Sequence, residues 1–358
     1  MIEDFRNQYV NDMSAHPNLT ITDINSRLPP VSEFRLMPWS RSYGGDYYGA
    51  LKVAAKHCGL GEVPERYPGN WQHGTWPPWQ KIQPEVLVYG APKSSRCFVA
   101  RPDEVVFLKE GGYRDVRAIG LPIIYTQPSG LERIPNSLLV MPTHSLVTDV
   151  IQPPTSRYIS EIESIRNRFN FVAACVSAQC IARGMWVDEL ARRGIPVIRG
   201  AGIDDANALA RMRALFESFE YVTTDTYGSH VSYALYFGAK VSIWGTATPA
   251  LRENVLSDGA WAPFPEAVDK LFSEETARLE REYLKTLRTD PWNGVLDVSA
   301  GKLMLGHEKK LTPREMRQAF RWTPFGVLTG VIRQRVRSSQ VWRAGSAAKR
   351  RLFANAKG

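Results

Sequence analysis

Between residues 171 and 245, the hydrophobic pattern switches most regularly between strand-like apolar runs and segments with helical spacing. Four apolar runs there have the length and β-branched content of buried strands: 171–176, 195–198, 221–224 and 241–244. Three segments between them have helical spacing: 178–193, 204–219 and 231–237. A strand–helix order that repeats in this way predicts a parallel, doubly wound sheet.

The first half of the chain shows a weaker version of the same alternation. Apolar runs predict further strands at 86–89, 116–120, 123–125 and 137–141, and helices are expected at 46–58 and 103–111. Pro153-Pro154 is a plausible joint between domains. We therefore expect an α/β protein with two Rossmann-like domains facing a cleft, over 1–152 and 153–265. Residues 266–358 are expected to add one long helix at 268–288 and a basic helical tail.

Charge is distributed unevenly along the 358 residues. From residue 301 onward, fourteen Lys or Arg are opposed only by Glu308 and Glu315, so this region has a net charge of +12. The whole chain has a net charge of +9, so residues 1–300 carry −3. In the tail, aromatic and aliphatic residues alternate with arginines, as in VIRQRVR (331–337) and Val341-Trp342-Arg343. This pattern predicts that 309–358 bind an anionic membrane surface, although a solvated basic tail would give a similar composition.

Several classes of protein are disfavoured by the composition. No apolar run reaches the length of a membrane-spanning helix, and the acidic, polar N-terminus predicts no secretory signal peptide. The four cysteines lack CxxC spacing, which favours buried free thiols over a metal site or disulfides. We expect a cytoplasmic protein that associates peripherally with the inner face of the cytoplasmic membrane. The acidic body argues against nucleic acid as a partner.

The loop that follows the 221–224 strand has the features of an anion site. Thr226, Gly228, Ser229 and His230 precede or open the helix at 231–237. Free backbone N–H groups and the positive end of the helix dipole favour a phosphate there, and glycine permits close approach of the backbone. A plain turn glycine and cap residues would explain the same letters. We predict that this loop binds the phosphates of a nucleotide sugar.

Two more histidines follow strand-like or turn-prone runs. His144 and Ser145 come after the apolar run that ends at Met141, and His73 lies in the segment NWQHG. Loops at the carboxyl ends of parallel strands line the ligand crevice of such sheets, so the histidines at 73, 144 and 230 are expected to lie together. Each taken alone is as well explained as a structural histidine. A zinc site formed by the three is a weaker alternative, because no pair has the spacing of metal ligands on a helix or a ribbon.

Three side chains are candidates for acid–base chemistry: Asp46, His73 and Glu110. Asp46 also suits a helix N-cap, and Glu110 a solvated helix end. Asp204-Asp205 lacks the D-x-D form that would hold a divalent cation, so we expect a reaction without a metal or other cofactor. Next to His73, Trp71, Gln72 and Trp76 are candidates for contact with a sugar, with packing of an irregular loop as the alternative.

Four segments resemble bacterial glycosyltransferases of the GT-B fold, especially those that build surface polysaccharides (capsule or O-antigen): NWQHG (70–74), IGLPIIY (119–125), LVMPTHS (139–145) and TDTYGSHVSYALYFGAKV (224–241). The resemblance implies a C-terminal domain that binds the donor and an N-terminal domain that binds the acceptor. His144-Ser145 is similar to the His-Pro motif of GT-B sialyltransferases, with Ser in place of Pro. The resemblance to GT-B glycosyltransferases also implies phosphate contacts for Gly228, Ser229 and His230, and acceptor-side roles for His73 and Asp46.

The expected function is transfer of a sugar from a nucleotide-sugar donor to a glycan or lipid-linked acceptor. Two alternatives remain open at this point. A sugar-nucleotide epimerase has the same double-Rossmann architecture and needs neither an acceptor nor the basic tail. A non-enzymatic protein could instead bind anions or nucleic acid through that tail.

Overall fold

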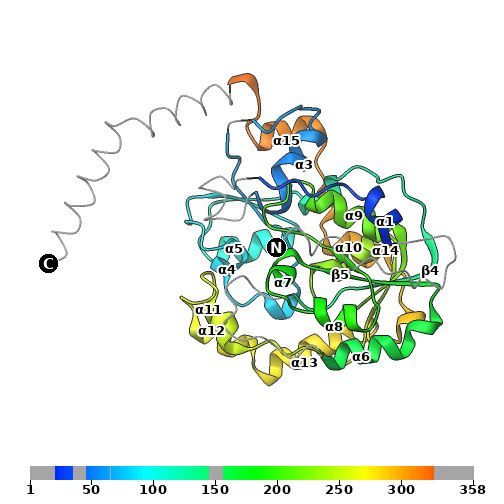
Figure 1. Cartoon of the computed structure of the whole chain (residues 1–358). Helices are drawn as coiled ribbons and strands as arrows, with labels where there is room; N and C mark the ends of the chain where they lie inside the picture. The colour runs from blue at the N-terminus through cyan, green and yellow to red at the C-terminus, as the bar shows by residue number, and fades with distance from the viewer. Residues whose placement is uncertain (1–20, 35–45, 65, 145–155, 326–358) are drawn as a thin grey trace.

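Parallel strands form two sheets in the computed structural model, which describes residues 21–34, 46–64, 66–144 and 156–325 (Figure 1). The first sheet has the order β1-β2-β3: β1 (Asn70–Trp71), β2 (Arg96–Val99) and β3 (Asp115–Ala118). The second has the order β6-β5-β4-β7-β8: β4 (Ile134–Val140), β5 (Phe171–Val176), β6 (Val197–Arg199), β7 (Phe219–Thr224) and β8 (Lys240–Ile243). The predicted α/β class with a parallel, Rossmann-like sheet is confirmed.

The described α-helices are α1 (Ile21–Arg27), α3 (Ala50–His57), α4 (Pro84–Leu87), α5 (Pro102–Glu110), α6 (Ser156–Ile165), α7 (Ala178–Ala182), α8 (Val187–Arg192), α9 (Ala208–Ser218), α10 (Ser229–Tyr236), α11 (Arg252–Ser257), α12 (Pro265–Leu271), α13 (Glu274–Leu284), α14 (Val298–Met304) and α15 (Pro313–Ala319). The 3-10 helices are η2 (Tyr47–Gly49), η3 (Pro78–Gln80), η4 (Pro122–Tyr125), η5 (Arg166–Arg168), η6 (Pro291–Asn293) and η7 (His307–Lys309). No helix in the described ranges is both long and apolar enough to cross a membrane.

Both faces of the five-stranded sheet are covered by helices. Side chains alternate between the faces of a strand, so Leu139 joins one hydrophobic cluster with α9 and α10, while Leu138 and Val140 join another with α6 and α8. Figure 1 shows α9 and α10 on one side of this sheet and α6 and α8 on the other. Burial on both faces explains why these strands read as continuous apolar runs.

The strand order reverses between β4 and β7. Leu138 pairs with Val172 of β5 on one side and with Tyr221 of β7 on the other, both in parallel. The chain leaves β4 toward β5 and β6, and it returns to the opposite edge of β4 as β7. Ligands of open α/β sheets bind outside the carboxyl ends of the strands at such a reversal.

Some expected elements are wrong in type or extent. Residues 86–89 fall on α4 and the turn after it, 123–125 lie in η4, and the short strands β1 and β2 were not predicted. The single helices expected at 178–193 and 268–288 are each divided into two, as α7 with α8 and α12 with α13. β4 belongs to the second sheet, so a first domain that extends to residue 152 assigns this strand to the wrong sheet.

The C-terminal helices return to the first sheet, where Figure 1 shows α15 beside α3. The Trp322 indole N–H donates to the Arg66 carbonyl at 3.0 Å, and Phe320 packs edge-on against Trp71 with ring centroids 5.3 Å apart. Four side chains of this region are buried: Leu311, Met316, Phe320 and Trp322. The part of the predicted membrane tail before residue 323 is therefore part of the core, since its apolar residues serve packing.

A single hydrophobic cluster includes Trp71 and Phe98 of the first sheet and Leu139 and Val222 of the second. The four cysteines are free and buried, as expected. The two sheets thus share core packing.

Substitution of Gly301 in α14 tests the contact between the returning C-terminal segment and helix α10 of the second sheet. A Cβ atom at this position would lie 2.4 Å from the backbone N of Tyr236 on α10, and backbone cannot move aside cheaply. We expect Gly301→Ala to lower the free energy of unfolding by about 1–3 kcal/mol, despite the better helix propensity of alanine. Urea unfolding followed by circular dichroism measures this. Gly61→Ala is the control, because a Cβ there meets nothing within 4 Å; equal stability of the two variants would contradict the described packing.

Candidate functional site

A buried carboxylate organises the carboxyl edge of the second sheet. Asp225, 3% exposed, follows β7 and accepts hydrogen bonds from the Thr143 backbone N–H at 2.7 Å and the Thr143 hydroxyl at 2.9 Å. It also accepts one from the Thr248 N–H at 2.9 Å. The loops after β4, β7 and β8 are therefore joined through one side chain. The Thr143 and Thr226 hydroxyls lie 2.9 Å apart beside it.

Helix α10 begins directly after this loop. Its N-cap residue, Gly228, has an extended backbone and offers no side chain to the first turn. The positive end of the helix dipole and its N–H groups are thus left without a side-chain cap. Thr226, Gly228, Ser229 and His230 lie at this helix start, and their binding of an anion stays a prediction.

The loop after β1 of the first sheet packs on this helix end. The Thr75 N–H donates to the Ser229 hydroxyl at 3.0 Å, and the Thr75 hydroxyl lies 3.1 Å from the Tyr227 hydroxyl. Tyr233 of α10 donates to the His73 carbonyl at 2.6 Å. A Cβ at Gly74 would lie 2.7 Å from the Ser229 hydroxyl, so glycine permits this approach. The carboxyl ends of the two sheets are in direct contact.

Aromatic rings surround the imidazole of His73. The Tyr89 ring stacks on it at 4.8 Å and its hydroxyl lies 2.8 Å from Nε2, while the rings of Tyr47 and Tyr48 approach at 5.4 and 5.3 Å. Burial raises the pKa of the Tyr48 hydroxyl to about 12. These hydroxyls are neutral hydrogen-bond donors near pH 7.

The imidazoles of His73 and His230 are neutral near pH 7. Burial, together with a smaller effect of the charge of His144, lowers the pKa of His73 to about 4 and that of His230 to about 3. His144 therefore lies near both, as expected, on the exposed side of the group. Within the described ranges, His73 Nδ1 and His230 Nε2 are buried without a hydrogen-bond partner. A ligand oxygen or N–H would recover the free energy lost in burying them.

Asp46 lies at the N-terminus of η2, directly before the tyrosines that flank His73. It is 8% exposed, and burial raises the pKa of its carboxyl to about 6, against a smaller opposing effect of a backbone hydrogen bond from Leu51. A carboxylate with a pKa near neutrality is suited to accept a proton from a hydroxyl group. The Asp46 carboxyl makes no hydrogen bond to the first turn of η2, but it accepts from the Leu51 N–H in the first turn of α3, so the helix-capping alternative also describes this residue.

Other predicted site residues lie elsewhere or have structural partners. Glu110 is exposed at the C-terminus of α5, about 12 Å along the helix from the N-terminus that faces the β1 loop. Trp71 is fully buried and its indole N–H donates to the Gly120 carbonyl, so it cannot stack on a sugar. Ser145 lies outside the described residues.

Gln72 and Trp76 also make packing contacts. Gln72 is 2% exposed, and it accepts from the Ala100 N–H at 2.9 Å and donates to the Gly74 carbonyl at 2.8 Å. It thereby fixes the loop that carries His73. Trp76 stacks on Trp261 with ring centroids 6.0 Å apart. The packing alternative explains both residues.

The site contains residues that were not predicted to belong to it: Tyr47, Tyr48, Tyr89, Thr143, Asp225, Tyr227 and Tyr233. Tyr47 and Tyr48 follow Asp46 directly, and Thr143 and Asp225 end adjacent parallel strands, which is a usable signal in sequence. Tyr89 carries no such signal, because the apolar run 86–89 predicts a strand where the structure has α4 and a turn.

Two cavities lie away from these histidines. One of about 530 Å³ is lined by residues of η4, α9, α10 and α14, and one of about 320 Å³ by residues of α13, α14 and η7. None of Asp46, His73, His144 and His230 lines either cavity. The case for the site at the strand ends therefore rests on its hydrogen bonds and burial.

No family model matches the chain, and no curated protein shows significant similarity to it. Within the described ranges, no three His, Cys, Asp or Glu side chains are grouped to hold a metal ion. A metal-independent reaction stays a prediction.

Asp46 gives a test with a defined dependence on pH. Between pH 3.8 and about 6 the folded state binds a proton that the unfolded state has lost, so this group stabilises the fold at low pH and that contribution disappears as pH rises through about 6. We expect Asp46→Asn to raise the free energy of unfolding by about 1–3 kcal/mol at pH 8 and to change little near pH 4. Urea unfolding at both pH values measures the difference.

Glu110→Gln provides the control for that experiment, because it removes an exposed carboxylate. A difference between Asp46→Asn and the parent chain that is the same at pH 4 and pH 8 would contradict the shifted pKa.

Proposed function

We propose that the protein is a glycosyltransferase that takes its sugar from a nucleotide-sugar donor, with the donor phosphate at the N-terminus of α10. The observation that carries this proposal is the meeting of the two sheets at their carboxyl ends, where the β1 loop packs on α10 next to the β4–β7 strand reversal. A nucleotide binds at such a reversal in doubly wound sheets, and a phosphate binds at such a helix N-terminus.

The chemistry of the neighbouring side chains supports the same assignment. The departing nucleotide phosphate gains negative charge in the transition state of sugar transfer. Hydrogen-bond donors that are already oriented stabilise that charge without reorganisation. His230, whose Nε2 has no partner among the described residues, is the proposed donor to the phosphate together with the first N–H groups of α10. Its low pKa means that it acts as a neutral donor.

Acid–base work is assigned to the first sheet's side of the site. Asp46, with a pKa of about 6, is mostly ionised at pH 7 and is proposed to accept the proton of the acceptor hydroxyl. The tyrosines around His73 supply hydroxyl donors and ring faces suited to a sugar. The GT-B arrangement, with donor and acceptor on opposite sides, follows from this proposal.

The donor site is tested by calorimetry with UDP-, GDP-, CMP- and dTDP-sugars. We expect one of them to bind, and His230→Leu to weaken its affinity by roughly tenfold, because a buried hydrogen bond to a charged group is lost. His230→Leu is preferred to replacement of Ser229, whose hydroxyl also accepts the Thr75 N–H. Glu110→Gln should bind as the parent chain does. Unchanged affinity of His230→Leu, or no binding of any of the four donors, would refute the proposal.

The basic tail is proposed to hold the enzyme at an anionic membrane where a lipid-linked acceptor is presented. Residues 326–358, outside the described ranges, contain Arg333, Arg335, Arg337, Arg343, Lys349, Arg350, Arg351 and Lys357 and no acidic residue. Each basic residue near such a surface contributes about 1 kcal/mol. Residues up to Trp322 belong to the core, so the truncation should begin after Phe325.

We expect the full chain to sediment with phosphatidylserine vesicles at low salt and the chain ending at Phe325 to stay in the supernatant. Vesicles of neutral lipid are the control. Equal sedimentation of the two chains with anionic vesicles would show that the tail is a solvated segment.

A further inference from the structure

The cavity of about 530 Å³ lies at the other end of α10 from the histidines. It is lined by the C-terminal end of α10, by α9, by η4 with the residues after it, and by the returning segment with Lys302 and Lys310. Arg133, just before β4, donates to the carbonyls of Phe237 and Gly238, which places this end of α10 at the amino edge of the second sheet. The cavity is therefore separate from the proposed donor site.

Its charge is positive and uncompensated. Among the described residues that line it, Glu217 is the one acidic side chain, and it accepts from the Arg213 guanidinium at 2.7 Å and from the Ser129 hydroxyl and N–H. Arg213 and Glu217 thus neutralise each other. Lys302 and Lys310 are exposed and form no ion pair or hydrogen bond among the described residues, although the Lys310 ammonium lies over the Tyr125 ring at 5.6 Å from its centroid. The described lining therefore has two net positive charges.

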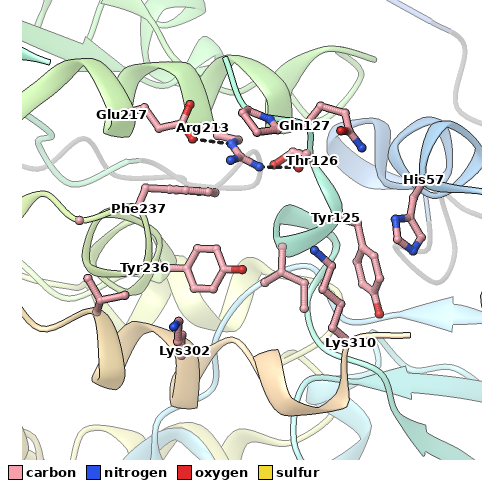
Figure 2. Close-up of a pocket in the computed structure, with 14 residues that line it drawn as sticks. His57, Tyr125, Thr126, Gln127, Arg213, Glu217, Tyr236, Phe237, Lys302 and Lys310 are labelled. Carbon is pink, nitrogen blue, oxygen red and sulfur yellow. Dashed lines mark hydrogen bonds and ion pairs between the residues drawn. The ribbon is translucent and has the colours of Figure 1, made fainter. Parts of the chain in front are cut away.

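The cationic groups around this cavity interact unfavourably with one another. The pKa of Lys310 is lowered, mainly by burial and further by the charge of Arg213, and Lys310 in turn lowers the pKa of His57 beyond the effect of burial. Figure 2 shows Lys310, Lys302 and Arg213 around one space, with the rings of Tyr125 and Phe237 on its sides. The Tyr236 hydroxyl lies 2.8 Å from His307 Nδ1. An anion in this space would relieve the repulsion.

We propose that this cavity binds a small molecule that carries a phosphate monoester on a sugar ring. Two ammonium groups without an ion pair among the described residues match the two charges of a phosphate monoester, whereas a carboxylate would neutralise only one. A volume of about 530 Å³ is within the usual range for small-molecule sites, which are frequent where separate units of a fold meet. Here η4 of the first sheet, α9 and α10 of the second, and the returning C-terminal segment all contribute.

The test measures binding by calorimetry at pH 8, where a phosphate monoester is doubly charged because its second pKa is about 6. The probes are a hexose 1-phosphate, inorganic phosphate, a hexuronic acid and a free hexose. We expect the hexose phosphate to bind most tightly, inorganic phosphate and the hexuronic acid more weakly, and the free hexose not detectably. Lys302→Gln with Lys310→Gln should weaken the hexose phosphate by roughly tenfold or more.

Lys109→Gln with Lys270→Gln is the matched control, because it removes the same charge from positions on α5 and α12 that are also exposed but do not line the cavity. His230→Leu should leave this binding unchanged, so failure of the donor site and failure of this site are distinguishable. The inference is overturned if the hexose phosphate does not bind the parent chain, or if it binds the Lys302/Lys310 variant as tightly as the control. It is also overturned if the free hexose or the hexuronic acid binds the parent chain as tightly as the hexose phosphate.

Discussion

The buried carboxylate of Asp225 is the interaction on which the carboxyl edge of the second sheet depends. A carboxylate with 3% exposure requires compensation for its lost hydration, and here two N–H groups and one hydroxyl supply it. Those donors belong to Thr143 and Thr248, so the loops after three adjacent strands are fixed relative to one another. Removing the carboxylate would leave these donors unpaired together. The start of α10 is positioned by this arrangement.

The first sheet adds what the second lacks. Its β1 loop carries His73 onto the helix end, and the loop conformation is set by Gln72, which bonds to the Ala100 N–H and the Gly74 carbonyl. Behind Gln72, Glu104 is fully buried and contacts both Gln72 and Arg101. Burial raises the pKa of Glu104, with the charge of Arg101 partly opposing it. Buried polar networks of this kind rigidify a loop, because a member whose partner moves loses the hydrogen bond that compensates for its lost hydration.

Helix α10 connects the two sites discussed for this protein. Its first turn faces the histidines and the β1 loop, and its last turn borders the cationic cavity. Eight residues separate these ends by about 11 Å. Helix α14 packs against α10, and its Gly301 approaches the Tyr236 backbone closely enough to exclude a side chain. The chain that returns from the second sheet to the first therefore supports α10 as well as completing the core of the first sheet.

The sequence by itself determined four strands of the second sheet and the position of α10, whereas the place of β4 in that sheet came only from the structure. Apolar runs buried on both faces have a clear pattern, and glycines after the helices mark their ends, so 171–176, 221–224 and 241–244 correspond closely to β5, β7 and β8. The order of these elements also predicted that His73, His144 and His230 would lie together, since carboxyl ends of parallel strands share an edge. The first sheet was harder to predict from the sequence, because β1 has only two residues and β2 only four.

Only the tertiary structure decided which polar residues of the site are structural. Trp71 and Gln72 stand next to His73 in the sequence, yet one enters the core and the other bonds to backbone, because successive residues of an extended segment point to opposite sides. The tyrosines around His73 come from residues 47, 48 and 89, and no local pattern relates such distant positions. The cationic cavity is likewise formed by segments between residues 57 and 310. Side chains that meet through packing leave no periodic signal in the chain, whereas strands and helices do.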